Sequence, residues 1–250
     1  MAGDLDAALA RFGGVSLDEL DHRAALLRRV DTKYSAVWDC FLELLDRLRA
    51  GHDVLHINGQ RVFSYRTTYF DTPKLRCFTD HVEDRHPRFK ARTRRYLDSD
   101  SCVFEVKLKP GPGETDKRQI DYPASDAERF TESARQCLAE ALSGAGLEAP
   151  AQMAPTLQTA FRRITFASRD SAERLTCDLG VRLSSPDGDV ARMHDGLVLI
   201  ETKTEEGDST AQSVLTDVGA EKISLSKYRV GMGLVGAADD TPQPGSELFS

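Results

Sequence analysis

Charged and apolar side chains alternate along residues 88–109 of the chain. The charged side chains occupy every second position of two runs: Arg88, Lys90, Arg92, Arg94, Glu105, Lys107 and Lys109. Apolar side chains fill most of the remaining positions: Phe89, Ala91, Val103, Phe104, Val106 and Leu108. Because successive side chains of a β-strand point to opposite faces, this period predicts two strands, each with a row of charges on one face. The polar residues 97–101 between the runs predict a hairpin.

The same alternation recurs in three further segments. The repeated positions are Arg29, Asp31 and Lys33, then Arg174, Thr176 and Asp178, then Glu201 and Lys203. One polar strand face of this kind is ordinarily solvated in an antiparallel sheet. Several cation-rich faces are explained more simply if they line one enclosed cavity, and a closed antiparallel barrel provides such an interior.

Helical patterns lie between the strand-like segments. Ser16 and Glu19 have the spacing of a capping box and predict a helix over 16–29. Apolar residues at helical intervals predict a second helix over 36–50, with Trp38 as a packing residue. Further helices are predicted at 124–146 and 209–218, and further strands at 61–73, 156–168, 174–183 and 196–203. The fold class that we expect is α+β, an antiparallel β-barrel tunnel with helices packed outside.

The composition, with 29% charged and 40% hydrophobic residues among 250, is that of a soluble globular protein. We expect one domain over 16–235, a flexible N-terminus at 1–15 and a disordered tail at 236–250. No apolar run is long enough to span a membrane. The N-terminus lacks the pattern of a signal peptide, so the expected location is the cytoplasm. The five cysteines lie far apart without a CxxC pair, which predicts reduced thiols and neither a zinc site nor a disulfide framework.

The net charge of −7 argues against a nucleic-acid partner. Positive charge is concentrated locally, since residues 85–118 contain ten Lys or Arg and five Asp or Glu. This distribution favours a pocket for an anion in an otherwise acidic protein. A flexible loop predicted at 109–119 carries Lys117 and Arg118, which either fold over a bound anion or are solvated.

Eight cations are the candidates to face the cavity: Lys33, Arg92, Arg94, Lys107, Arg163, Arg174, Lys203 and Lys227. Because so many cations repel one another at low dielectric, the cavity requires a polyanionic occupant. Phosphate chains fit, since Arg binds phosphate oxygens bidentately and Lys supplies point charge. Lys90 and Lys117 are further phosphate-binding candidates. Glu201, with Glu105 as a second candidate, suits Mn²⁺ or Mg²⁺, which bind one or two carboxylates together with phosphate oxygens.

Seven short motifs resemble, in order, those of the VTC domain, the catalytic domain of the vacuolar transporter chaperone polyphosphate polymerase. They lie within about residues 20–232: RRVDTKY, KARTRRY, FEVKLK, the FRR of TAFRRITF, RLTCD, LIETK and SLSKY. The resemblance implies the triphosphate tunnel fold, which CYTH-type phosphatases share. It also implies roles in gripping and reacting a triphosphate for the eight cations, and a metal-binding role for Glu201.

The chain departs from the family pattern at three places. Phe161 stands where the family has tyrosine, which removes a hydroxyl and keeps the ring. Arg29 replaces the first acidic residue of the superfamily's ExExK pattern and Asp31 stands at the second, which argues against a two-metal hydrolase arrangement. Lys117 aligns only loosely with the family's loop lysine.

The resemblance implies metal-dependent phosphoryl transfer from ATP to a growing polyphosphate chain. Two other functions remain open: hydrolysis of tripolyphosphate or nucleoside triphosphate, and non-catalytic sensing of polyphosphate. The expected ligands are ATP and polyphosphate or triphosphate. A membrane-protein partner is compatible with the resemblance, and the sequence sets no oligomeric state.

Overall fold

A computed structural model describes residues 2–23, 30–205, 209–236, 238 and 243–250. The predicted position of Arg29 lies outside these residues. The chain divides into two compact units, and the expected single domain over 16–235 stays a prediction. The first comprises Met1–Phe63, Phe161–Val181 and Met193–Ser224, and the second Ser64–Ala160, Arg182–Arg192 and Leu225–Ser250. Two long strands, β8 (Ala154–Ser168) and β9 (Arg174–Ser184), contribute residues to both units.

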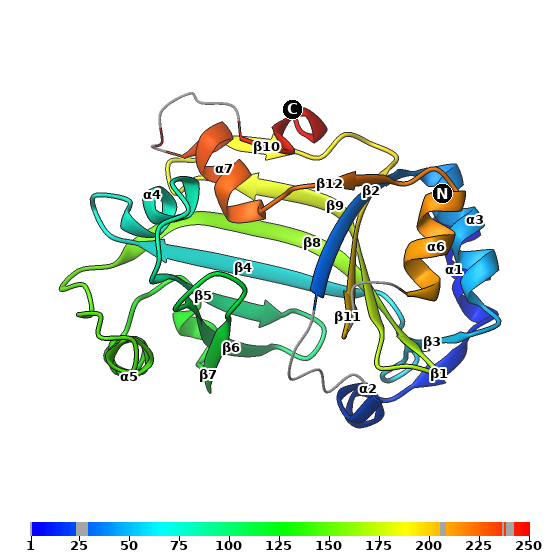
Figure 1. Ribbon diagram of the computed structural model, residues 1–250, viewed down its shortest axis with the longest axis horizontal. Helices are drawn as coiled ribbons and strands as arrows, with labels where there is room; N and C mark the ends of the chain where they lie inside the picture. Colours follow the sequence, from blue (N-terminus) through cyan, green and yellow to red (C-terminus); the bar gives the residue numbers. More distant parts are fainter. Residues whose placement is uncertain (1, 24–29, 206–208, 237, 239–242) are drawn as a thin grey trace. The chain divides into compact units, whose positions relative to one another are not determined.

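The first unit is a sheet with helices beside it (Figure 1). Its main strand order is β12-β2-β11-β9-β8, and β3 pairs antiparallel with β8 and parallel with β1. The strands are β1 (Gly13–Val15), β2 (Val30–Val37), β3 (His52–Leu55), β11 (Leu197–Thr204) and β12 (Glu221–Ile223). The helices are α1 (Ala2–Ala10), α2 (Leu17–Arg23), α3 (Trp38–Leu48) and α6 (Thr210–Asp217).

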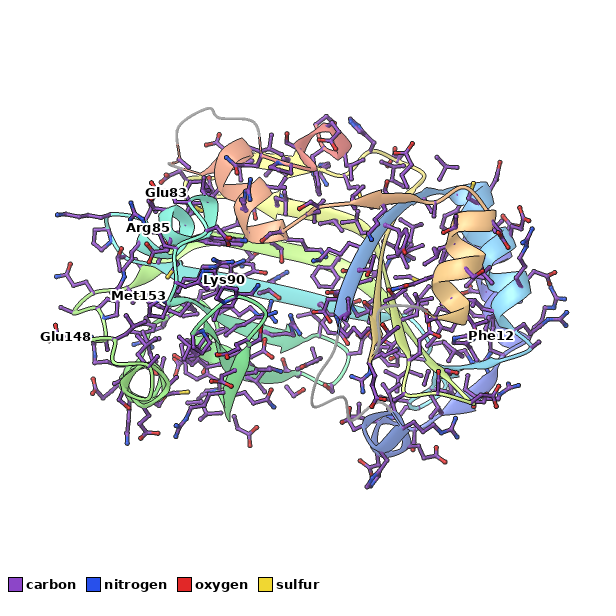
Figure 2. The ribbon with its side chains drawn as sticks, viewed as in Figure 1. Phe12, Glu83, Arg85, Lys90, Glu148 and Met153 are labelled. Atoms are coloured by element: carbon purple, nitrogen blue, oxygen red, sulfur yellow. The ribbon has the colours of Figure 1, made fainter. Side chains whose placement is uncertain are left out.

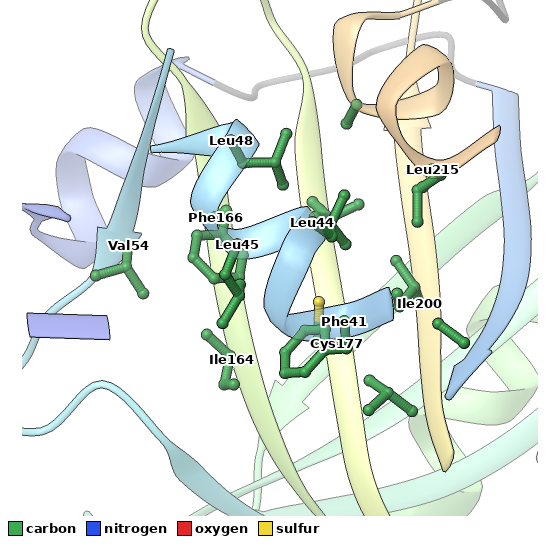
Figure 3. Packing of buried hydrophobic residues seen from close by; sticks show 14 of the residues in the cluster. Phe41, Leu44, Leu45, Leu48, Val54, Ile164, Phe166, Cys177, Ile200 and Leu215 are labelled. Atoms are coloured by element: carbon green, nitrogen blue, oxygen red, sulfur yellow. The ribbon is translucent and has the colours of Figure 1, made fainter. Parts of the chain in front are cut away.

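Helix α3 covers the apolar side of this sheet. Phe41, Leu44, Leu45 and Leu48 are buried along one side of the helix, as the 3.6-residue period predicts. Figure 3 shows them against side chains of β8, β9 and β11, which are Ile164, Phe166, Cys177 and Ile200. Because strand side chains alternate, the burial of these residues leaves their neighbours in the chain on the opposite face.

The second unit is built on the strand order β8-β4-β5-β6-β7, with the short β10 paired to the end of β9. Its strands are β4 (Phe63–Asp71), β5 (Arg88–Tyr96), β6 (Ser101–Lys109), β7 (Asp116–Asp121) and β10 (Val190–Arg192). Its α-helices are α4 (Arg76–Val82), α5 (Glu132–Ser143) and α7 (Lys227–Val235). Two 3₁₀ turns, η1 (Ala124–Asp126) and η2 (Ser246–Leu248), complete it.

The apolar side of β5 and β6 forms the core of the second unit. Phe89, Ala91, Phe104 and Val106 are each at most 1% exposed, and Leu138 of α5 is fully buried. Helix α5 packs against β6 and β7. The predicted hairpin is confirmed, since Arg88–Tyr96 pair antiparallel with Ser101–Lys109.

The structure differs from the prediction at both ends of the chain. Helix α1 lies in the segment that we expected to be flexible, with Leu5 and Leu9 buried. At the other end Phe249 is buried, and the backbone N–H of Ser250 donates to the carbonyl of Arg192. Composition does not reveal these contacts, because a few apolar anchors in a polar segment suffice to dock it.

The α+β class and the large antiparallel sheet are confirmed, and closure of the sheet into a barrel stays a prediction. The capping box is also confirmed, because Ser16 and Glu19 exchange hydrogen bonds at the start of α2. No helix in the part of the chain that the structure describes is long and apolar enough to cross a membrane.

Candidate functional site

The charged side of β5 and β6 forms the first candidate surface, which we call the β5 face. The strand register sets Lys90 opposite Lys107, Arg92 opposite Glu105 and Arg94 opposite Val103. Opposite residues share a face of the sheet, so the predicted row of charges is confirmed. Val103 stands on this charged side, although we had grouped it with the apolar residues, because its position has the same parity as Glu105.

Glu105 is the shared partner of three cations on the β5 face. Its carboxylate accepts from Arg92 Nε at 2.7 Å and lies 2.5 Å from Lys117 Nζ and 3.9 Å from Arg94 Nη2. Its side chain is 2% exposed. Burial alone would raise the pKa of Glu105, but the three cations outweigh burial and hold that pKa well below its usual range. Glu105 is therefore an ionised internal counterion.

Lys117 reaches Glu105 from a strand, which corrects the prediction of a loop over 109–119. Asp116–Asp121 form β7, in which Lys117 stands opposite Lys107 and Arg118 stands opposite Val106. Residues 110–115, between β6 and β7, lie outside the strands. Arg118 therefore lies on the side of the sheet opposite Lys117, where it forms an ion pair with Glu140 of α5.

An aromatic and carboxylate network that sequence reasoning missed supports the β5 face. Arg92 lies over the ring of Tyr69 at 5.9 Å, and Tyr69 stacks on Tyr228 with ring centroids 4.9 Å apart. The Tyr228 hydroxyl donates to Asp71 at 2.5 Å, and Asp71 also accepts from the backbone N–H of Cys77 in the first turn of α4. Asp71 and Tyr228 are 157 positions apart in the chain, and no pattern within either segment indicates their contact.

Tyr228 follows Lys227, the predicted tunnel lysine, at the start of α7. Ser226 caps this helix by accepting from the backbone N–H of Arg229. Lys90 of β5, labelled in Figure 2, lies 3.3 Å from the same Ser226 hydroxyl. Buried Tyr228 thus holds the first turn of α7, with Lys227, close to the charged side of β5. The structure places Lys227 at the N-terminus of α7.

The second candidate surface, which we call the β11 face, lies on the first unit. Glu201 of β11 stands opposite Lys33 of β2 and Thr176 of β9, and Lys203 stands opposite Asp31 and Arg174. The register confirms the predicted shared face at the described positions, and Arg29 lies outside them. The carboxylate of Glu201 lies 2.8 Å from Lys203 Nζ. Burial would raise the pKa of Glu201, but Lys203 and Lys33 outweigh it and hold the pKa well below its usual range.

Arg163 of β8 completes the β11 face through a bidentate ion pair. Its Nε and Nη2 donate to the two carboxylate oxygens of Asp178 at 2.6 and 2.8 Å. The guanidinium carbon lies 5.1 Å from the centre of the Phe161 ring. The ring at position 161 therefore orients the arginine without needing the hydroxyl of the family's tyrosine.

Arg174 shares the strand face but its guanidinium points elsewhere. It donates to Asp21 at 3.0 Å and to the carbonyl of Leu20 at 3.2 Å, at the end of α2. The strand period correctly predicts the face on which the Cα of Arg174 lies. It does not predict the end of a long side chain, which here binds residues of α2. The ten phosphate-binding candidates are divided between the two units. Six belong to the second unit, Lys90, Arg92, Arg94, Lys107, Lys117 and Lys227, and four to the first, Lys33, Arg163, Arg174 and Lys203.

Comparison with protein families identifies the stretch that carries both faces. The model of the VTC domain matches residues 28–235, well over half of the chain. The chain belongs to the VTC domain family. This confirms the resemblance drawn from the seven motifs.

Solved structures are similar to this VTC domain at low sequence identity. A putative adenylyl cyclase from Hippeastrum, described as having a dominant triphosphatase activity, is 14% identical with a TM-score of 0.52, covering 82% of this chain and 94% of that one. A putative adenylate cyclase from Vibrio parahaemolyticus is 15% identical with a TM-score of 0.45, covering 80% and 95%. The first similarity shows a shared fold alone. No curated protein sequence matches the chain.

The two predicted metal ligands of the VTC domain differ in how well they suit a divalent cation. Glu105 lies among three cations, which disfavours a further positive charge there. Glu201 and Asp31 both approach Lys203 Nζ, at 2.8 and 3.8 Å, so two carboxylates gather at one cationic position. One or two carboxylates with phosphate oxygens suit Mg²⁺ or Mn²⁺. Among the described residues no group of three or more His, Cys, Asp or Glu forms a self-sufficient metal site.

Proposed function

We propose that the protein is a polyphosphate polymerase that transfers the γ-phosphoryl group of ATP to the end of a polyphosphate chain. The observation that supports it best is that the acidic groups among the cations are already ion-paired. Glu105 contacts Arg92 and Lys117, Asp178 contacts Arg163, and Glu201 contacts Lys203. A hydrolase needs a group that orients or deprotonates water. A terminal phosphate oxygen needs no such base, because it is an anionic nucleophile already.

The proposed reaction forms one bond to phosphorus and breaks one. A terminal oxygen of the chain forms a bond to the γ-phosphorus of ATP while the bond from that phosphorus to the β–γ bridging oxygen breaks, and ADP leaves. Positioning and charge stabilisation supply most of the catalysis in phosphoryl transfer. A divalent metal bound by Glu201 and Asp31 would supply positive charge to the phosphate oxygens.

Each face carries an arginine that is suited to bind phosphate oxygens. Tyr69 and Glu105 hold Arg92, and Phe161 and Asp178 hold Arg163, so each guanidinium is oriented before substrate arrives. A preorganised fork loses less entropy on binding than a mobile one. Lys33, Lys107, Lys203 and Lys227 would add point charges. Arg94, Lys90 and Lys117 would extend the phosphate contacts on the β5 face.

The test is incubation of the purified protein with ATP and Mn²⁺ or Mg²⁺, followed by separation of the products by chain length. Long chains are the expected result. Orthophosphate without chains would identify a hydrolase, and unchanged ATP with measurable polyphosphate binding would identify a sensor. Glu140→Gln is the matched control, since it removes a carboxylate from an exposed ion pair with Arg118 outside both faces.

A further inference from the structure

One end of the β5 face carries positive charge without a carboxylate on the same strands. Arg88 stands directly opposite Lys109, and Lys90 stands directly opposite Lys107, whereas Glu105 lies at the next cross-strand pair. Like charges directly opposite each other destabilise a strand pair. This end of the β5 face is therefore better suited to a bound anion than to water alone.

Arg88 is held in place by the protein at this end. Its side chain is 8% exposed, with Nη1 2.6 Å from Asp84 and 3.0 Å from the carbonyl of Arg85. The side chain of Asp84 is 77% exposed. An exposed carboxylate is well screened by water and competes weakly with a multivalent anion.

Two helices bring further nitrogen donors to the same end. Helix α4 packs against β5 and α7. It carries His81, whose Nδ1 is buried and has no hydrogen-bond partner among the residues that the structure describes. Helix α7 carries Arg229, whose Nε donates to Gln243 at 2.5 Å. A buried nitrogen without a partner is unfavourable, and a bound acceptor would relieve it.

His81 is surrounded by the cations of β5, β6 and α7. Burial first, and then the positive charges of four neighbours, lower its pKa to about 2; the neighbours are Lys90, Arg88, Arg229 and Lys109. The imidazole is thus neutral at physiological pH and carries one N–H that can donate to an anion. The geometry agrees, because Arg88 stands opposite Lys109 and α4 packs against both β5 and α7.

We propose that His81, Arg88, Lys109 and Arg229 form an anion subsite that binds phosphate units of a chain beyond those held at Arg92 and Arg94. The identity of the anion as polyphosphate rests on the proposed function. Arg88 and Arg92 are four residues apart in one strand, which separates their Cα atoms by about 13 Å. A single phosphate cannot contact both positions, and an extended phosphate chain can.

Binding measured by calorimetry without ATP or metal tests this subsite. Lys109→Gln and Arg229→Gln should each weaken binding of long-chain polyphosphate about tenfold, and should leave the affinity for tripolyphosphate within about twofold, by loss of about one charged contact of 1.4 kcal/mol. Arg135→Gln is the matched control. It removes an exposed arginine of α5, in the same unit, that pairs with Glu132.

His81→Phe provides a variant that keeps ring volume and net charge while removing both ring nitrogens. It should also weaken long-chain binding and spare tripolyphosphate. Unchanged long-chain affinity in all three variants would overturn the subsite, as would an equal loss for both ligands. Because no ATP or metal is present, these results do not depend on whether the protein elongates chains. Failure of the polymerase assay with an intact chain-length effect would reject the proposed function alone.

Discussion

The two polar faces balance their charges differently. On the β5 face one carboxylate, Glu105, serves three cations, and its side chain is 2% exposed. On the β11 face Asp178 pairs with Arg163, Glu201 and Asp31 both approach Lys203, and the Glu201 side chain is 25% exposed. The comparison suggests two roles for acidic residues among cations: Glu105 holds the charged strands together, and Glu201 is accessible to exchange its lysine for a metal.

Glu105→Gln should have the largest effect, and the effect should be on folding. Removing the carboxylate leaves Arg92, Arg94 and Lys117 without their shared partner, and breaking a buried ion pair costs about 3 kcal/mol. The free energy of unfolding, measured with urea, should fall by about that amount, and tripolyphosphate should restore part of it by binding the folded state. Glu140→Gln serves as the control. A stable Glu105→Gln variant would show that the three cations do not need their counterion.

Glu201→Gln should act mainly on turnover, which should be lost while the fold stays intact. The change removes the proposed metal ligand but little volume, and losing electrostatic stabilisation of this kind lowers kcat by about a hundredfold or more. The rate of ATP turnover in saturating Mn²⁺ measures it. Near-normal turnover would show that Glu201 is only a salt-bridge partner of Lys203. The β11 face would then lack the metal-binding role that distinguishes it from the β5 face.

Arg92→Lys and Arg163→Lys test whether both faces use arginine forks. Each change keeps the charge and loses the bidentate geometry, so kcat/KM should fall about tenfold, or 1.4 kcal/mol. Arg135→Lys on the exposed side of α5 is the control. If only one of the two variants loses activity, the faces are not equivalent in phosphate binding, and the intact variant marks a structural ion pair.

Sequence reasoning succeeded where a short period decides the outcome. Alternation in β5, β6 and β11 placed Arg92, Glu105 and Glu201 on polar faces, because a strand has only two faces and one of them must be apolar. The capping box at Ser16 was also predicted correctly, because its two residues are only three positions apart. The match to the VTC domain family supports the order of the motifs.

Sequence reasoning failed where the partner comes from a distant element. Arg174 reaches Asp21 of α2, and Tyr228 donates to Asp71 across a separation of 157 positions. No local pattern records either contact. Lys117 was placed in a loop because its glycine and proline neighbours hid a short edge strand. Such contacts depend on packing in three dimensions, which the periodicity of one segment does not specify.

The smallest expected effect is a difference in how the groups near each face change the free energy of unfolding as the pH falls. His81, near the β5 face, has a folded pKa of about 2, lowered by burial and by the cations Lys90, Arg88, Arg229 and Lys109. The unfolded chain therefore binds more protons below the ordinary histidine pKa of about 6.5, so stability is lost as the pH falls through that value. Between pH 7 and 5.5 the loss from this group should be about 1 kcal/mol.

The carboxylates of both faces respond in a different window. The pKa values of Glu105 and Glu201 are lowered, so their contribution to stability is present above the ordinary value of about 4.5 and is lost only below it. Urea unfolding at pH 7 and 5.5 should therefore show a loss in the wild type that is smaller by about 1 kcal/mol in His81→Phe, which cannot take up the proton. His22→Gln, at an exposed position of α2, controls for loss of a histidine. Equal losses in wild type and His81→Phe would show that this histidine does not sense the cations of the β5 face, and the difference between the faces would then rest on Glu105 alone.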